Sequence, residues 1–161
     1  MKKIVLSVLV DNSSGVLSRV AGLFSRRGYN IDSLTVGETQ NPAFSRMTIV
    51  ARGEEQDLEQ VKKQLLKLVD VIDVKELPPE DAVCRELVLV KVAIEPANRP
   101  QIIAIADVFR AKIVDVGERS VIIELTGSVS KLEAFLRLLG EYKVLQVART
   151  GITGLARGMA D

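Results

Sequence analysis

The 161-residue sequence contains no histidine and no tryptophan, and it has one cysteine, Cys84. Without histidine the chain has no histidine general base and no histidine metal ligand. A single cysteine forms neither an intrachain disulfide nor a structural zinc site, and no basic cluster beside Cys84 activates its thiol. These absences exclude much of enzyme chemistry and leave carboxylates, lysine, serine and arginine as reactive groups.

The sequence also has no large excess of one charge, because its 22 Lys and Arg residues are balanced by 21 Asp and Glu residues. The near-neutral chain has no strong attraction to nucleic acid or to anionic membranes, and two tyrosines and four phenylalanines offer little for base stacking. No segment reaches the ~18 apolar residues that span a bilayer. The first apolar run ends at Asp11 and Asn12 without a small-residue cleavage site. We expect a cytoplasmic protein with no nucleic-acid or membrane partner.

Apolar periodicity predicts the order βαββαβ in the first half of the chain. A helix is expected from Val16 to a stop at Gly28, because apolar residues recur on one face and glycine readily takes positive φ. A second helix is expected over residues 58–68. Strands are predicted over residues 4–10, 30–36, 44–51 and 71–77.

The same order repeats in the second half. The expected elements are a strand over residues 87–94, a helix around 102–109, a hairpin over 113–125, a helix opened by a capping box at Ser130, and a strand over 144–148. This repeat predicts an α+β protein of two ferredoxin-like βαββαβ sandwiches with antiparallel sheets. The predicted boundaries are a first domain over 1–77, a linker over 78–85 and a second domain over 86–161.

Two helices cover only one face of each predicted sheet, yet the first strand of each half is apolar on both sides. The uncovered faces should therefore bury against the other domain or a second copy, and we expect at least a homodimer. For the glycine-rich tail, residues 150–158, a disordered end and a partner-docking segment remain open alternatives.

The loop over residues 11–17 is the strongest candidate for a binding site. It joins a predicted strand to a helix N-terminus, where free N–H groups and a partial positive charge suit a carboxylate. Gly15 permits close approach to its backbone, and Asn12 adds an amide. Asn30, at the start of the adjacent strand, offers a second amide, so an amino acid is a fitting ligand.

A structural interpretation of the same loop also remains open, in which Ser13 or Ser14 caps the helix and Gly15 eases the turn. The equivalent loop of the second half, residues 95–100, lacks the Asn-x-x-Gly pattern. This difference favours a ligand site confined to the first half.

Other charged residues are expected to be structural. Arg26 and Arg27, with Arg19 nearby, fit an exposed helix face better than an anion site. We interpret Asp70 as a charged residue on an edge strand. For Arg46, a contact across an interface and an exposed strand position remain equally open.

Several segments resemble the bacterial acetolactate (acetohydroxyacid) synthase small subunit family, and the first half resembles an ACT domain, a small-molecule sensor module of amino-acid metabolism. The resemblance extends over almost the whole chain. The matching segments are residues 11–20, 24–34, 45–49, 68–71, 86–92 and 148–151.

The resemblance implies a non-catalytic regulatory subunit. Its partner would be the large catalytic subunit, which carries thiamine diphosphate, magnesium and FAD and joins pyruvate to pyruvate or 2-oxobutanoate. The small subunit would raise that activity and confer feedback inhibition by valine or a related branched-chain amino acid. A free-standing ACT-type sensor that regulates another enzyme is the alternative. A small hydrolase and an RNA-binding module on the same fold are weaker rivals.

The resemblance also implies roles for six residues, at a site between the subunits of an ACT dimer. Asn12 and Asn30 would hold the polar groups of the amino acid. The backbone N–H groups of Gly15, Val16 and Leu17 would bind its carboxylate, and Ile31 would line the side-chain pocket. No catalytic residue, metal ligand or cofactor is expected in this chain.

Overall fold

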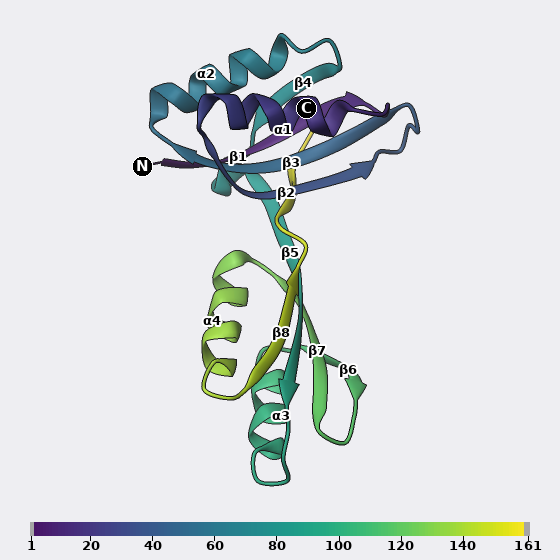
Figure 1. The fold of residues 1–161 in the computed structure, drawn as a ribbon, viewed down its shortest axis with the longest axis vertical. Coiled ribbons are helices and arrows are strands. Elements are labelled where there is room, and N and C mark those ends of the chain that lie inside the picture. Colours follow the sequence, from purple (N-terminus) through teal and green to yellow (C-terminus); the bar gives the residue numbers. More distant parts are fainter. Residues whose placement is uncertain (1, 160–161) are drawn as a thin grey trace. The chain divides into compact units, whose positions relative to one another are not determined.

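A computed structural model describes residues 2–159, which form two compact units (Figure 1). The first unit contains the residues up to Cys84 together with those from Ile152 onward, and the second contains Arg85–Gly151. Each unit is an antiparallel sheet with two helices packed on one face. The predicted α+β class and the repeated βαββαβ order are confirmed.

The first unit has a four-stranded sheet in the order β2-β3-β1-β4, so β2 and β4 are its edges. Even-numbered residues of β1 and odd-numbered residues of β3 point toward the helices and form the core, as the two-residue period of a strand requires. The elements are β1 (Lys2–Asp11), α1 (Val16–Arg27), β2 (Asn30–Glu38), β3 (Phe44–Gly53), α2 (Glu55–Leu66) and β4 (Val71–Glu76).

Helix α1 has the bounds that the sequence predicts. It begins at Val16 and ends at Arg27, followed by the C-cap Gly28, whose φ of 72° is the left-handed conformation that favours glycine. Its buried stripe is made of Val16, Val20, Leu23 and Phe24, which recur at helical spacing. This packing fixes the start of α1 against the end of β1.

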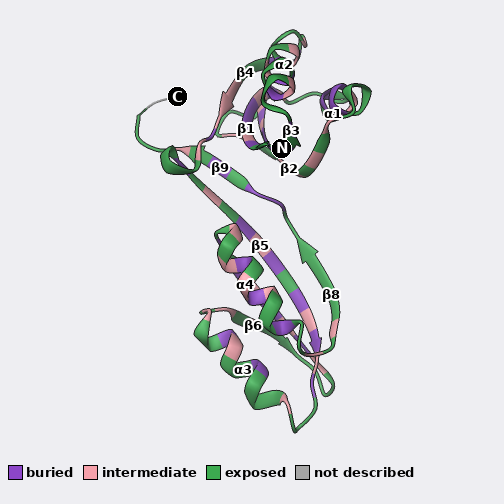
Figure 2. Ribbon diagram, turned by 90° about the vertical axis from the view of Figure 1, so that its left-hand side faces the viewer, coloured by how far each residue is buried: buried purple, intermediate pink, exposed green. Residues whose placement is uncertain are grey.

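The second unit has the strand order β6-β7-β5-β8 and its own core. Burial follows one face of each of its helices (Figure 2). Its elements are β5 (Ala82–Ala93), whose residues 82–84 belong to the first unit, α3 (Arg99–Val108), β6 (Lys112–Val116), β7 (Ser120–Gly127), α4 (Val129–Leu139) and β8 (Val144–Arg149).

The predicted start of α4 at Ser130 is wrong by two residues. The cap is Ser128, whose hydroxyl accepts a hydrogen bond of 3.4 Å from the N–H of Lys131. Ser128 has extended backbone angles, which an N-cap requires, whereas Ser130 already lies in the first helical turn.

Residues 152–159 belong to the first unit. Strand β9 (Thr153–Ala156) pairs with β5 and lies against β3. The N–H of Ile152 donates to Ser33 Oγ at 3.3 Å, and Thr35 Oγ1 donates to the carbonyl oxygen of Ile152 at 3.2 Å. The sequence predicts that residues from 152 onward lie in the second domain. It leaves a disordered end and a partner-docking segment as alternatives for the tail. Within residues 2–159, the tail instead packs on the first sheet of its own chain.

The face of the first sheet that points away from α1 and α2 is buried in part. Ser7, Thr48 and Val50 point away from α1 and α2, yet each is at most 4% exposed. Ile152, at 7% exposed, is buried with them in the same unit. The segment predicted as a linker, residues 78–85, contains the short helix η1 (Pro79–Asp81) and the first residues of β5.

Candidate functional site

The loop between β1 and α1 presents a helix N-terminus without a side-chain cap. Gly15 is the N-cap residue, its φ is 86°, and no side chain accepts a hydrogen bond from the first turn. Neither Ser13 nor Ser14 caps α1, so the structural interpretation of these serines is wrong. The first turn also has no acidic residue. The N–H groups of Val16 and Leu17 make no hydrogen bond to another residue within 2–159, which leaves them available to an anion.

Asn12 is held by the hairpin between β2 and β3. Its backbone N–H donates to the carbonyl oxygen of Ala43 at 2.8 Å. Its side-chain Nδ2 donates to the carbonyl oxygen of Pro42 at 2.9 Å and to Glu38 Oε2 at 3.3 Å. Among the described residues no donor reaches Asn12 Oδ1. The amide is therefore oriented by its nitrogen and keeps its oxygen for a ligand donor such as an ammonium group.

The side chains of Val16 and Leu17 have different surroundings. Val16 is buried in the core, and Leu17 is 47% exposed. Leu17 therefore presents both a backbone N–H and an apolar side chain at the mouth of this loop.

Asn30 and Ile31 lie at the other end of the same sheet. Both β1 and β2 pair antiparallel with β3, where Asp11 is opposite Phe44 and Asn30 is opposite Arg52. At ~3.3 Å per residue, this register separates Asn30 from the Asn12 loop by roughly 25 Å along β3. Within one chain, the structure does not bring the two asparagines together.

The surroundings of Asn30 are polar. Asn30 Nδ2 donates to Asp32 Oδ1 at 3.1 Å, and Asp32 Oδ2 pairs with Arg52 Nη2 at 2.8 Å. A cavity of about 440 Å³ lies beside Asn30 and is also lined by Arg52 and Tyr29. Ile31 is partly buried against the core.

Arg19 and Asp70 form an ion pair beside the first loop. Arg19 Nε donates a hydrogen bond of 2.5 Å to Asp70 Oδ2, and this hydrogen bond raises the pKa of Arg19. Asp70 is buried and precedes β4, so its interpretation as a charge on the edge strand is wrong. Gly15 and Arg19 are four residues apart, a spacing that places residues close together on one face of a helix, so the sequence indicates their contact. No local pattern indicates that Asp70 joins them.

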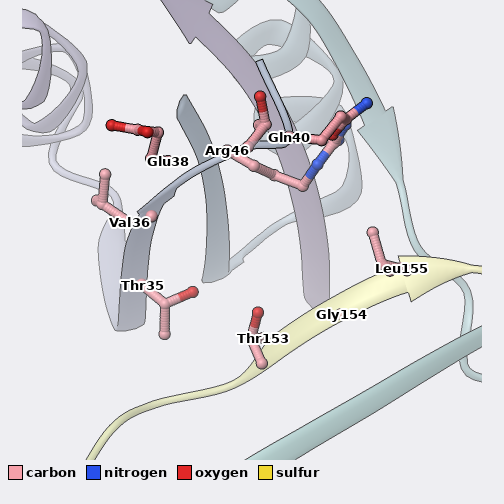
Figure 3. A pocket seen from close by; sticks show the side chains of 10 residues that line it. Thr35, Val36, Glu38, Gln40, Arg46, Thr153, Gly154 and Leu155 are labelled. Carbon is pink, nitrogen blue, oxygen red and sulfur yellow. The ribbon is translucent and has the colours of Figure 1, made fainter. Parts of the chain in front are cut away.

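A second cavity, of about 360 Å³, lies where the end of β2 faces β9. Figure 3 shows Thr35 and Thr153 on its walls, with Arg46 across from β9. Arg46 Nη1 donates to Ser7 Oγ at 2.8 Å. None of the six predicted site residues lines this cavity, although Glu38, which accepts a hydrogen bond from Asn12, does.

The described residues also bear on other classes of site. Within residues 2–159, no three or more Cys, Asp or Glu side chains cluster to hold a metal ion. No helix of this part of the chain is long and apolar enough to cross a membrane.

Comparison with known protein families covers both halves of the chain. Residues 6–73 match the model of the AHAS small subunit-like ACT domain, and residues 85–158 match that of the small subunit of acetolactate synthase. The chain belongs to the acetolactate synthase small subunit family. The resemblance drawn from the sequence is thereby confirmed. A small subunit with an ACT domain is a regulatory, non-catalytic part of an enzyme complex, and its partner is the large subunit.

Individual members of the acetolactate synthase small subunit family are similar over nearly their whole length. The acetolactate synthase small subunit of Mycobacterium leprae is 50% identical over 153 residues, which cover 95% of this chain and 90% of that protein. The isozyme 3 small subunit of Salmonella typhimurium is 49% identical over 155 residues, which cover 96% and 95%. The crystal structure of the small subunit from Thermotoga maritima matches with a TM-score of 0.91 and 42% identity, covering 99% of this chain and 100% of that one.

Proposed function

We propose that this chain raises the activity of the acetolactate synthase large subunit and makes it sensitive to feedback inhibition by valine. Family membership supports the partner, and the uncapped helix N-terminus beside Asn12 supports the ligand class. The single observation that carries the proposal is the set of N–H donors at Val16 and Leu17 and the Oδ1 acceptor of Asn12 in the same loop, all without a hydrogen-bond partner among residues 2–159. An amino acid needs donors for its carboxylate and acceptors for its ammonium group.

The proposed site assigns each predicted residue to one part of the ligand. Backbone N–H groups of Gly15, Val16 and Leu17 bind the carboxylate, and Asn12 Oδ1 accepts from the ammonium group. The second amide, Asn30, and the apolar contact, Ile31, come from another copy of the chain.

The sheet topology supports this sharing between two copies. Strand β2 is an edge of its sheet, so its outer backbone groups are free to pair with another strand. When two β2 strands pair antiparallel about a two-fold axis, the start of one lies beside the end of the other. Asn30 starts β2, and Glu38, which contacts Asn12, ends it. A homodimer of this kind therefore brings Asn30 of one copy to the Asn12 loop of the other.

Inhibition then follows from linkage. Valine binds with different affinity to the activating and the inhibiting arrangement of the complex, and it shifts their populations by that difference. A coupling free energy of ~1–3 kcal/mol changes the ratio of the two arrangements about 5- to 150-fold. The thiamine diphosphate, magnesium and FAD of the reaction are assigned by this proposal to the large subunit.

The test is a rate assay on the reconstituted complex. The chain is co-purified with the large subunit, and acetolactate formation is measured with and without the small subunit and with valine, leucine or isoleucine. We expect the small subunit to raise the rate and valine to lower it. A chain that purifies without the large subunit but binds a branched-chain amino acid would instead favour the free-standing sensor.

A further inference from the structure

The Arg19 side chain folds back over the start of its own helix. If a Cβ atom is built on Gly15, it lies 2.9 Å from Arg19 Nη1, 3.6 Å from Cζ and 3.7 Å from Nη2. The guanidinium group therefore covers the backbone of Gly15. This is the backbone that the proposed function assigns to the ligand carboxylate.

Asp70 fixes the guanidinium in this place. The Asp70 side chain is 12% exposed and accepts from Arg19 Nε, whereas the Arg19 side chain is 48% exposed. The Asp70 backbone is anchored as well, because its carbonyl oxygen accepts a hydrogen bond of 2.9 Å from the N–H of Asp11. An almost buried carboxylate thus ties Arg19 to the end of β1.

The ion pair uses only part of the donor capacity of Arg19. A guanidinium has five N–H donors, and the hydrogen bond to Asp70 engages Nε. Within residues 2–159, Nη1 and Nη2 donate to no protein acceptor. Nη1 is the atom nearest to a Cβ built on Gly15, at 2.9 Å, and Nη2 lies 3.7 Å from it. A guanidinium fork of this kind pairs well with a carboxylate.

We propose that Arg19 binds the carboxylate of the amino-acid effector through Nη1 and Nη2, and that Asp70 is the residue that positions Arg19 for this contact. The inference rests on the proposed function and adds a side-chain cation to a site otherwise built from backbone N–H groups. It predicts that the site selects a free carboxylate over a neutral amide.

Helix α1 supplies a matched control. Arg26 stands four residues after Gly22 as Arg19 stands four residues after Gly15, and its Nη1 lies 3.6 Å from a Cβ built on Gly22. Arg26 is exposed and forms no ion pair among the described residues. The Arg26→Gln variant therefore removes the same charge from the same helix without touching the Asp70 contact.

The experiment is calorimetric titration of the full chain with L-valine and with L-valinamide, for wild type, Arg19→Gln and Arg26→Gln. Loss of a hydrogen bond to a charged group corresponds to roughly a 10- to 100-fold loss of affinity. We expect that loss for L-valine in Arg19→Gln, little change for L-valinamide, and wild-type behaviour in Arg26→Gln. Equal weakening of both ligands in Arg19→Gln, or unchanged valine affinity, would overturn the inference.

Asp70 is tested in combination with Arg19. Asp70→Asn keeps the size of the side chain and should weaken valine binding in the wild-type background, but it should add nothing in the Arg19→Gln background, because Asp70 acts through Arg19. An additional loss in the double variant would refute the positioning role. If the wild-type chain binds no branched-chain amino acid, the proposed function itself is wrong. If the wild-type chain binds valine and the Arg19→Gln variant binds it with the same affinity, only this inference is wrong.

Discussion

Arg19 Nη1 lies 2.9 Å from the place where a Cβ atom of residue 15 would stand, so Gly15 keeps this space empty for the guanidinium group. The φ of 86° at Gly15 adds a second requirement for glycine. Both the position of the Arg19 guanidinium and the backbone conformation therefore require glycine at position 15 of the proposed site.

Gly15→Asp should abolish inhibition by valine while leaving activation of the large subunit in place. The new carboxylate would pair with Arg19 and occupy the N–H groups that the ligand needs. The rate of the reconstituted complex with increasing valine measures this effect. Gly15→Asn is the control for shape and backbone strain, since asparagine has the same size and also tolerates positive φ. We expect Gly15→Asn to retain more of the valine response, and a Gly15→Asp complex that valine still inhibits would contradict the site.

Asn12→Ala and Asn30→Ala should each weaken valine binding, but a mixture of the two variants should recover part of it. If each site takes Asn12 from one copy and Asn30 from the other, a mixed dimer contains one site with both asparagines and one with neither. Mixing by unfolding and refolding yields about half mixed dimers, and calorimetry should then find about a quarter of the wild-type number of tight sites. Mixtures that bind no better than the separate variants would argue against sharing.

Gly154→Ala should lower the free energy of unfolding by about 1–3 kcal/mol, because overpacking strains a closed interior. A Cβ at this position would lie 2.7 Å from Cys84 Sγ and 3.1 Å from both Leu77 Cδ1 and the carbonyl oxygen of Val83. Urea unfolding gives the change directly. In the control Gly22→Ala, the Cβ meets only the tip of Arg26 at 3.6 Å, and we expect a gain of about 0.5–1 kcal/mol from helix propensity. Equal changes in the free energy of unfolding for Gly154→Ala and Gly22→Ala would show that β9 does not pack as described.

Lys62 should contribute to stability in a pH-dependent way. Its Nζ lies 2.7 Å from Glu59 Oε1 and 3.2 Å from Glu76 Oε2, and the hydrogen bond to Glu59 is the main cause that raises the pKa of Lys62 above 10.5. A raised pKa means that the contribution is complete below pH 10.5 and disappears as the pH rises through the folded-state value.

Lys62→Met should therefore reduce stability at pH 8 by up to about 1 kcal/mol, and the difference from wild type should shrink above pH 10.5. Chemical unfolding at several pH values measures both effects. Lys63→Met is the control, because Lys63 is exposed and has no ion pair among residues 2–159. A difference that grows with alkaline pH would contradict the assignment.

The elements of the fold were accessible to sequence analysis where the pattern is local. Helix α1 buries residues at spacings of three and four and ends at a glycine with positive φ, so its bounds could be predicted. The start of α4 was missed by two residues because Ser128 and Ser130 are both good capping residues, and only the backbone angles distinguish them. For the candidate site, the loop before α1 was found from its composition, whereas its partner Asp70 was not.

The sequence by itself determined the order of strands and helices within the two βαββαβ repeats, the repeat itself and the family, because short-range periodicity and contiguous motifs carry that information. Only the tertiary structure decided that Ile152 bonds to Ser33 and Thr35, more than 100 residues away, and that Asn30 stands at the opposite end of the sheet from Asn12. Strand register and contacts between distant segments depend on how whole faces pack together, and no local pattern of residues records the result.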